Sequence, residues 1–330
     1  MAGRGAETLM PRFSVVVPAY NASATLGETL DAMLQQEFAD WECIVVDDGS
    51  ADDTAMIASG YVERDSRFRL IRQENQGTAG AYRTGLESSG ADLLVICAAD
   101  DLLLPRHLLV MDDLVTRHPN CGIYSCNGEF LDHETGNRRV GYVGPEWQRE
   151  KSLTFEQVIV GCFYSVGVVF TRGTYDLVGG HRVGVYVDDY DLWLRAMARG
   201  VKHCYSPEVL SVHRVSSFQQ SASGRRVLES NIEVYEHLLS QGPLSDPQVA
   251  LVHESIERNR AQIEYLIGTE LERQAQAFRA RVEGCVGPNH IDAVMWVIHR
   301  FSWVLAPIRR LLVRRNLRYN IVGAPPSSGD

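Results

Sequence analysis

The 330-residue sequence lacks the features that define several common classes of protein. Its seven cysteines are odd in number and scattered, and no CxxC pair with a partnering histidine occurs, so we expect neither a disulfide framework nor a zinc site. Reduced thiols fit a cytosolic protein. The segment Met1–Arg12 is too polar for a secretory signal, and the longest uncharged apolar run, Val158–Phe170, is too short to span a membrane.

The sequence also has no excess of basic residues. The chain has 32 Lys and Arg against 42 Asp and Glu, a net charge of −10, which makes it a poor general binder of nucleic acid. No GxGxxG follows the first predicted strand and no GxxxxGK[ST] occurs, so neither a dinucleotide fold of the usual kind nor a P-loop is supported. Hydrophobic residues at 45% and charged residues at 22% fit a globular protein of one large or two modest domains.

The first 130 residues alternate strand-like and helix-like patterns, which predicts a mainly parallel sheet with helices on both faces. We expect strands at Phe13–Val17 (ended by Pro18), Cys43–Val46, Phe68–Ile71 and Leu93–Cys97. We expect helices over Leu26–Leu34 with Asn21 or Ser23 as N-cap, Asp52–Tyr61, Thr78–Ser89 and from Leu104 to Val115.

After Cys121 the pattern changes. Short strands are predicted at Cys121–Cys126, Val166–Thr171, Val201–Tyr205 and Val209–Arg214, with a turn at Glu134–Asn137 and a helix over Asp188–Arg199. Beyond Ser221 the chain reads as helical, apart from a tail over Pro325–Asp330.

Two pairs of acids follow predicted strands, Asp47-Asp48 and Asp100-Asp101. Each pair alone is explained equally well as turn chemistry, because Asp favours turns and helix caps. At equivalent positions on one sheet edge, however, the pairs favour a ligand site. Adjacent carboxylates supply the hard oxygen ligands that Mg²⁺ or Mn²⁺ needs to bridge a nucleotide diphosphate to an acidic chain.

A third group of acids, Asp188, Asp189 and Asp191, begins a predicted helix. The helix dipole accounts for acids at this end, most economically for Asp188 as cap and Asp191 in the first turn. Asp189 is left to point into a cleft as a general base, and the helix N-terminus is expected to keep it ionised.

Five ordered blocks resemble family 2 glycosyltransferases, which are inverting enzymes of the GT-A fold, over about residues 12–220. They are Ser14-Val-Val-Val-Pro-Ala-Tyr-Asn21, Ile44-Val-Val-Asp-Asp-Gly-Ser50, Glu74-Asn-Gln-Gly77, Ala99-Asp-Asp-Leu102 and Asp188-Asp-Tyr-Asp-Leu-Trp-Leu-Arg195. The resemblance implies a Rossmann-like, mainly parallel α/β sheet with helices on both faces and a C-terminal helical extension. The implied organisation is a polar segment 1–11, a GT-A domain 12–222 (nucleotide-binding part 12–130, acceptor-side part 131–222), a helical region 223–324 and a tail 325–330.

The resemblance also implies roles for individual residues. The donor nucleotide would contact Pro18, Ala19, Tyr20, Asn21, Asp48, Gly77 and Asp100. Asp100 and Asp101 would hold ribose, metal and diphosphate, and Asp189 would activate the acceptor. The Tyr20 ring offers a face on which a base can stack, although a half-buried strand-end aromatic is the alternative.

The sequence departs from the family pattern at Ala98 and Arg83 and follows it at His213. Ala98 stands where many members carry an acid, so one metal ligand is missing. Arg83 is displaced by one position from an arginine common in the family. It either contacts the diphosphate or lies on a solvated helix face. His213, beside Arg214, falls where members carry phosphate-side residues, and it is either a metal ligand or a structural histidine.

The last helical stretch has no acid between Asp292 and Asp330. Its arginines (Arg300, Arg309, Arg310, Arg314, Arg315 and Arg318) interleave with Trp296, Phe301, Trp303, Leu305 and Leu311. This pattern is typical of an interfacial helix on an anionic membrane, and equally of a stripe packed on the catalytic domain or on a second subunit.

These observations together predict a cytoplasmic, metal-dependent inverting glycosyltransferase, working either in solution or at the cytoplasmic membrane face. The expected donor is a UDP- or dTDP-linked sugar, the expected acceptor a hydroxyl of a glycan or lipid-linked saccharide, and the cofactor Mg²⁺ or Mn²⁺. Two other classes stay open: a non-catalytic sugar-nucleotide-binding relative, which Ala98 would suit, and a nucleotidyltransferase, whose basic loop after the first strand is not found at Ala19–Ala22.

Overall fold

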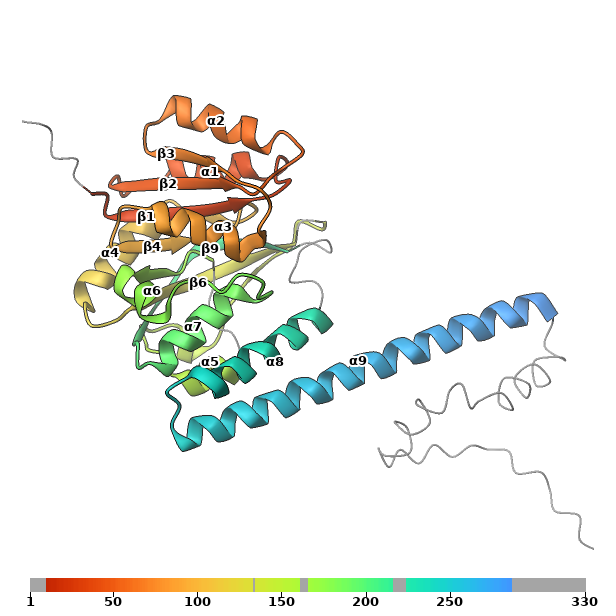
Figure 1. The fold of residues 1–330 in the computed structure, drawn as a ribbon. Coiled ribbons are helices and arrows are strands. Elements are labelled where there is room, and N and C mark those ends of the chain that lie inside the picture. The colour runs from red at the N-terminus through yellow and green to blue at the C-terminus, as the bar shows by residue number, and fades with distance from the viewer. Residues whose placement is uncertain (1–9, 133, 161–165, 216–223, 287–330) are drawn as a thin grey trace, which may run out of the picture. The chain divides into compact units, whose positions relative to one another are not determined.

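The computed structural model describes the backbone of residues 10–132, 134–160, 166–215 and 224–286, and the side chains of the same ranges apart from 271–272 and 275–286 (Figure 1). The chain separates into two units, Met1–Glu264 and Tyr265–Asp330. The first unit contains the sheet, the helices that cover it and the start of the long C-terminal helix.

Within the described residues one nine-stranded sheet has the order β3-β2-β1-β4-β8-β6-β9-β5, and β7 pairs with β6. Its first half is parallel, whereas β8 runs antiparallel to both β4 and β6. The mainly parallel sheet predicted for the N-terminal part is therefore confirmed. The strands are β1 Phe13–Ala19, β2 Trp41–Asp47, β3 Phe68–Arg72, β4 Leu93–Ile96, β5 Leu102–Leu103, β6 Ile123–Asp132, β7 Arg138–Val140, β8 Val169–Thr171 and β9 His203–Val215.

Two helical layers cover the two faces of this sheet (Figure 1). Because side chains alternate across a strand, Val15 and Val17 of β1 pack with α1, α2 and α4, while Val16 packs on the other face. That second face is covered by α3, α5, α6, α7, α8 and the start of α9. The helices are α1 Leu26–Leu34, α2 Thr54–Arg64, α3 Gly77–Ser88, α4 His107–Arg117, α5 Phe155–Val160, α6 Arg172–Val178, α7 Asp188–Ala198, α8 Gly224–Gln241 and α9 Asp246–Val286, with a 3-10 turn at Pro145–Trp147.

Several predicted boundaries are wrong for identifiable reasons. Strand β1 continues through Pro18, because the pairing with β4 has already ended at Val16 and the missing N–H of the proline costs no ladder bond there. Thr25, rather than Asn21 or Ser23, precedes α1, and it makes no side-chain cap. The two short strands predicted between residues 201 and 214 are one strand, β9, with register shifts against β6.

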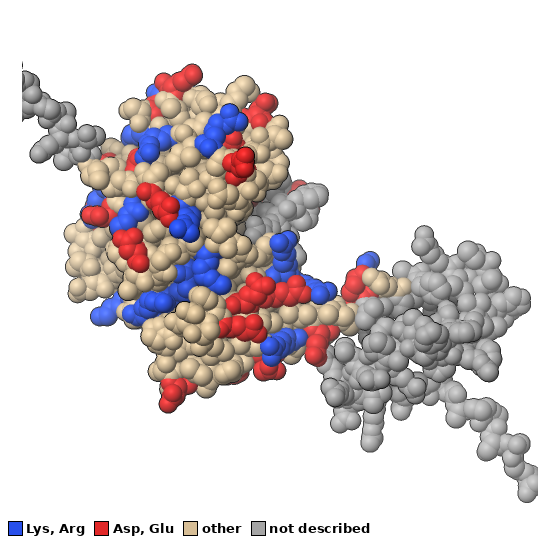
Figure 2. Space-filling model, viewed as in Figure 1, with Lys and Arg blue, Asp and Glu red and all other residues tan. Residues whose placement is uncertain are grey.

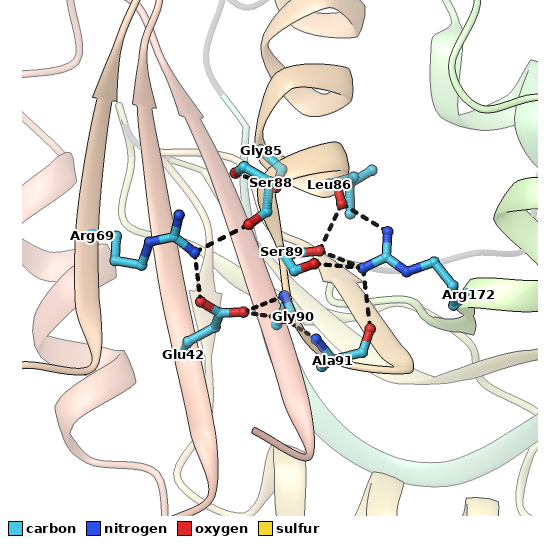
Figure 3. A network of polar contacts seen from close by, with 10 residues as sticks. Glu42, Arg69, Gly85, Leu86, Ser88, Ser89, Gly90, Ala91 and Arg172 are labelled. Atoms are coloured by element: carbon cyan, nitrogen blue, oxygen red, sulfur yellow. Dashed lines mark hydrogen bonds and ion pairs between the residues drawn. The ribbon is translucent and has the colours of Figure 1, made fainter. Parts of the chain in front are cut away.

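A polar network ties the sheet to the C-terminal end of α3 (Figure 3). Arg172, at the start of α6, donates to the carbonyl oxygens of Leu86, Ser89 and Ala91 and to the Ser89 hydroxyl at 2.7–3.1 Å. Glu42 of β2 accepts from the backbone N–H of Gly90 at 2.8 Å. The guanidinium of Arg172 thus supplies donors to carbonyls at and after the helix end, and Glu42 supplies an acceptor to the N–H of Gly90.

The expectation that no disulfide forms is wrong. Cys121 and Cys204 are bonded to each other. The parallel pairing of β6 with β9 places Tyr124 opposite Cys204, which brings the end of the preceding turn within reach of a cysteine 83 residues away. Sequence spacing gives no sign of a pair that only strand pairing assembles. Cys43, Cys97 and Cys126 are buried free thiols.

The first part of the helical region after residue 223 packs on the core. Val234, Tyr235 and Leu238 of α8 and Val252 and Ile256 of α9 are buried in the core on the second face of the sheet. No helix in the described part of the chain is long and apolar enough to cross a membrane. The arginine-rich stretch from Arg300 to Arg318 lies outside the described residues, as does the tail 325–330.

Candidate functional site

A cavity of about 1230 Å³ opens at the carboxyl ends of β1, β2 and β4. In a doubly wound sheet, this edge is where loops after the strands converge and ligands bind. The structure brings most of the sequence-predicted site residues together on its walls, namely Pro18, Ala19, Tyr20, Asn21, Asp48, Asp100, Asp101, Asp189 and His213.

Two of the predicted donor-binding residues do not line the cavity. Gly77 begins α3 in a left-handed conformation, and its neighbour Thr78 is on the wall instead. Arg83 is exposed and pairs with Glu87 one turn further along α3 at 2.7 Å. Its position in this structure is that of the solvated helix face.

The end of β1 and β2 forms the first wall. Tyr20 has 55% of its surface exposed at the cavity mouth. The buried Asp48 is held by Gln73 Nε2 at 2.7 Å and by the backbone N–H of Gln76 at 2.8 Å. Asn21 adopts a positive φ of 49°, and its Oδ1 accepts from the N–H of Ala51, so its side chain also fixes the turn.

The end of β4 carries the second wall. Asp101 is 3% exposed, and its two oxygens lie 3.0 and 3.2 Å from Nδ1 of His213. The backbone N–H of Arg214 donates to the same carboxylate at 3.0 Å. Antiparallel pairing of Leu102 with Val212 makes Asp101 and His213 the next pair in the register, although 112 residues separate them.

The two partners influence each other's protonation. Burial is the largest single influence and lowers the pKa of His213, but the hydrogen bond to Asp101 and the charges of Asp101, Asp100 and Asp189 together outweigh it, so the net shift is upward. Burial raises the pKa of Asp101, and the same hydrogen bond opposes that rise.

This pair also suits a divalent cation. Within the described residues no group of three or more His, Cys, Asp or Glu side chains could hold a metal ion. Mg²⁺ in nucleotide sites takes only one or two protein carboxylates, with phosphates and water as its other ligands, and imidazole is acceptable to softer ions of the same class. Asp101, alone or with one neighbour such as His213 or Asp100, would therefore supply one or two protein ligands to a cation that a diphosphate helps to bind.

The three acids at the start of α7 have three different environments. Asp191 is buried between Arg182 and Arg195, each 2.7 Å away, and is structural. Asp188 is buried and its Oδ2 makes no hydrogen bond. Asp189 is exposed in the cavity, where its carboxylate accepts from the N–H of Tyr190 at 2.7 Å.

The pKa of Asp189 is shifted in the direction opposite to the one that a helix N-terminus alone would give. The protein around the cavity desolvates its carboxylate and raises its pKa, and the hydrogen bond from the Tyr190 N–H only partly opposes this. The N-terminus of α7 is therefore not the largest influence on the pKa of Asp189. A carboxylate whose pKa is raised towards neutrality accepts a proton more readily, which suits a general base.

Sequence reasoning missed the residues of α8 that support this helix start. The Tyr190 hydroxyl lies 3.0 Å from that of Tyr235, and both are within 3.2 Å of the Ile159 carbonyl oxygen. The hydroxyl of Ser230 accepts from the N–H of Tyr186 at 3.2 Å. The only available signal was the apolar periodicity around Tyr235, which predicts a packed helix face but no partner.

The third wall of the cavity is also unexpected. It consists of residues on α8 and on the start of α9, none of which the five sequence blocks include. These residues are Val227, Leu228, Asn231, Tyr235, Arg258, Asn259 and Gln262.

Comparison with known proteins identifies the fold around this cavity. The sequence profile described as glycosyl transferase family 2 matches residues 14–168. The chain belongs to glycosyl transferase family 2. It is 30% identical to the uncharacterized protein MT1568 of Mycobacterium tuberculosis over 237 residues, which cover 66% of this chain and 73% of the relative. The matches cover only 22% and 41% of two other curated relatives.

Solved structures show the same GT-A architecture. S. aureus TarS in complex with UDP-GlcNAc superposes with a TM-score of 0.64 at 17% identity, covering 86% of this chain and 83% of TarS. The mannosyltransferase PcManGT of Pyrobaculum calidifontis, in complex with GDP-Man and Mn²⁺, gives 0.58 at 20% identity over 93% and 86% of the chains. The GT-A fold predicted for this family 2 member is confirmed.

The family match leaves part of the cavity outside it. It ends at residue 168, whereas Asp189, His213 and the whole α8–α9 wall come later in the chain. The profile thus covers the strand ends β1, β2 and β4 of the cavity, whereas Asp189, His213 and the α8–α9 wall lie beyond it.

Proposed function

We propose that this protein is a metal-dependent inverting glycosyltransferase, transferring a sugar from a UDP- or dTDP-type donor to a hydroxyl of a glycan or lipid-linked acceptor. The observation that supports it most directly is that one cavity contains Asp48 and the Asp101–His213 pair on one side and an exposed carboxylate, Asp189, on another. The nucleotide-sugar complexes of TarS and PcManGT support a donor of this chemical class.

The reaction we infer is a single displacement. Tyr20 stacks on the base, and Asp48, whose carboxylate is held by Gln73 and Gln76, is positioned to accept a hydrogen bond from a base or ribose. Asp100, Asp101 and His213 would hold Mg²⁺ or Mn²⁺, which supplies positive charge against the leaving diphosphate.

Asp189 takes the proton of the acceptor hydroxyl as that oxygen bonds to the anomeric carbon. The bond from this carbon to the diphosphate oxygen breaks, and its electron pair leaves with the diphosphate. Attack from the side opposite the leaving group inverts the anomeric configuration.

A screen of nucleotide sugars tests this function. Release of nucleoside diphosphate from UDP-, dTDP- and GDP-linked sugars is measured with Mn²⁺ and with EDTA. We expect one UDP- or dTDP-sugar to be turned over only with the metal, and the Asp189→Asn variant to bind that donor without turning it over. Donor binding without turnover in the unmodified protein favours the non-catalytic relative, which Ala98 suits. Release of pyrophosphate from a nucleoside triphosphate would instead show a nucleotidyltransferase.

We also propose that the protein acts at the cytoplasmic face of a membrane. The support is the sequence after Asp292, where arginines and aromatic residues alternate without an acid. Each basic residue near an anionic surface adds about 1 kcal/mol of attraction, which salt weakens. Flotation with anionic vesicles at low salt is the expected result. A protein that never floats, and elutes as a dimer, has this stripe in a subunit contact.

A further inference from the structure

The cavity has more room than one ligand requires. Sites for single small ligands occupy roughly 300–1000 Å³, whereas this cavity measures about 1230 Å³. Its carboxylate-bearing walls at the strand ends and at α7 account for a donor and a base. The remaining wall, formed by α8 and the start of α9, has no assigned ligand.

The polar groups on this wall are available to a ligand. Among the described residues, the side-chain amides of Asn231 and Gln262 make no hydrogen bond. Asn259 lines the same wall, and its Nδ2 donates to the Ser255 carbonyl oxygen at 3.0 Å while no described group donates to its Oδ1. Amide groups without a partner among the described residues are suited to hydroxyl groups, which both donate and accept.

Arg258 is the cation of this wall. Its Nη2 donates to the Ser255 hydroxyl at 3.1 Å, which orients the guanidinium, and it forms no ion pair with any described carboxylate. The nearby arginines are engaged elsewhere. Arg225 pairs with Glu229, Arg260 pairs with Glu236 and Glu257, and Arg226 lies over the ring of Tyr186.

Acidic residues line the other walls of the cavity and not the α8–α9 wall. None of the carboxylates of α8 or of α9 as far as Glu264 lines the cavity, and acids of these helices lie along the face seen in Figure 2. The carboxylates that do line it are at the other walls: Asp48, Asp100, Asp101, Asp188 and Asp189. An anionic group of a ligand on the α8–α9 wall therefore lies away from these carboxylates and close to Arg258, whereas the other cavity-lining cations, His213 and Arg214, are paired with Asp101 and Glu28.

We propose that the α8–α9 wall is the acceptor subsite and that it selects a hydroxyl-rich acceptor bearing an anionic group, a carboxylate or a phosphate, which Arg258 binds. Asn231 and Gln262 hydrogen-bond the hydroxyls of the same acceptor. This inference rests on the proposed glycosyl transfer. A planar guanidinium binds carboxylate and phosphate oxygens in pairs, so it recognises both sources of charge.

Matched acceptor probes test the proposal with the full-length protein. Binding in the presence of UDP and Mn²⁺ is followed by saturation-transfer NMR and calorimetry for methyl β-D-glucuronide against methyl β-D-glucoside, and for glucose 6-phosphate against glucose. The two pairs separate a carboxylate from a phosphate. We expect at least one anionic probe to bind roughly ten- to a hundred-fold more tightly than its neutral partner, the range for one charge-assisted contact.

Three variants complete the design. Arg258→Gln should abolish the preference for the anionic probe, Arg258→Lys should keep part of it, and the control Arg260→Gln, which removes a surface arginine of the same helix outside the cavity, should leave it intact. Equal binding of neutral and anionic probes, or no binding of either, overturns the proposal.

Donor binding separates the remaining outcomes. If Arg258→Gln weakens UDP binding as much as probe binding, the arginine belongs to the donor site and the proposal is wrong. If the unmodified protein binds no nucleotide at all, the proposed function fails, whatever the probes do.

Discussion

The hydroxyl groups of Tyr190 and Tyr235 lie 3.0 Å apart in the core between α7 and α8. One of them donates to the other, and the remaining proton is available to the Ile159 carbonyl oxygen, which lies 3.1 and 3.2 Å from the two. Tyr190 directly follows Asp189, and its N–H donates to the Asp189 carboxylate. A helix outside the family match thereby fixes the first turn that carries the candidate base.

Tyr235→Phe tests this relationship. Removing the hydroxyl leaves the ring packed but frees the first turn of α7, so we expect kcat to fall about three- to ten-fold with the donor KM unchanged. The loss of stability should be about 1 kcal/mol, as for one hydrogen bond. The matched control is Tyr205→Phe, whose hydroxyl reaches only the Trp147 carbonyl at 3.4 Å, away from the cavity. Equal effects of both variants on kcat would contradict a positioning role.

Asp189→Asn removes the ability to take a proton but keeps size and hydrogen bonding. We expect turnover to fall by roughly 10²–10⁴, the range for a positioned general base, while the dissociation constant for UDP stays within about two-fold of the parent. Steady-state rates and calorimetry measure the two quantities. Asp176→Asn, an exposed acid of α6 outside the cavity, is the control. A variant at Asp189 that transfers sugar at the parent rate would leave this residue with only a helix-start role.

Removing the metal should weaken nucleotide binding. Because the Asp101–His213 pair supplies protein ligands and the diphosphate supplies others, we expect UDP affinity to drop at least about ten-fold in EDTA. His213→Ala should reduce the difference between Mn²⁺ and EDTA, whereas His118→Ala, a surface histidine paired with Glu150, should not. Calorimetry that finds the same affinity with and without metal rules out the metal-dependent site.

Acid should destabilise the fold through His203. Its Nδ1 accepts from the N–H of Leu153 at 3.1 Å and its Nε2 lies 2.8 Å from the Ser125 hydroxyl, which is the pattern of a neutral ring. Burial lowers its pKa to about 3, whereas an unfolded histidine titrates near ~6.5. Below that value the unfolded chain takes up a proton that the folded chain does not, so stability is full above pH ~6.5 and declines as the pH falls towards 3.

The cost attributable to this one residue at pH 5 is about 2 kcal/mol. Urea unfolding at several pH values measures it. The His203→Gln variant, although less stable at neutral pH, should show a shallower decline, by close to one proton. His107 and His181 also have lowered pKa values, so the variant is compared with the parent at each pH. Identical slopes would mean that His203 is already charged in the folded state.

Arg172→Leu should destabilise the first unit. The guanidinium reaches three carbonyls at and after the end of α3, and leucine leaves them without this donor (Figure 3). We expect a loss of about 2–3 kcal/mol in the free energy of unfolding. Arg83→Leu, which breaks only an exposed pair with Glu87, should cost much less. Urea midpoints of the two variants would decide, and similar values would show that the network contributes little.

The sequence by itself determined the parallel half of the sheet and the donor-side residues. Strand and helix periods are local, and Asp48 and Asp101 directly follow apolar runs, so their place at the sheet edge follows from short-range pattern. Asp189 was found from a local pattern too, because adjacent residues in the sequence mark the start of its helix.

Only the tertiary structure decided the rest. The Asp101–His213 pair, the Cys121–Cys204 bond and the Tyr190–Tyr235 contact join residues 112, 83 and 45 positions apart, and each depends on strand register or helix packing that no local pattern encodes. The raised pKa of Asp189 has the same origin, because desolvation is set by the surrounding walls and not by its helix alone. The α8–α9 wall exists because these helices bury their apolar faces on the sheet layer, which leaves Arg258 at the cavity.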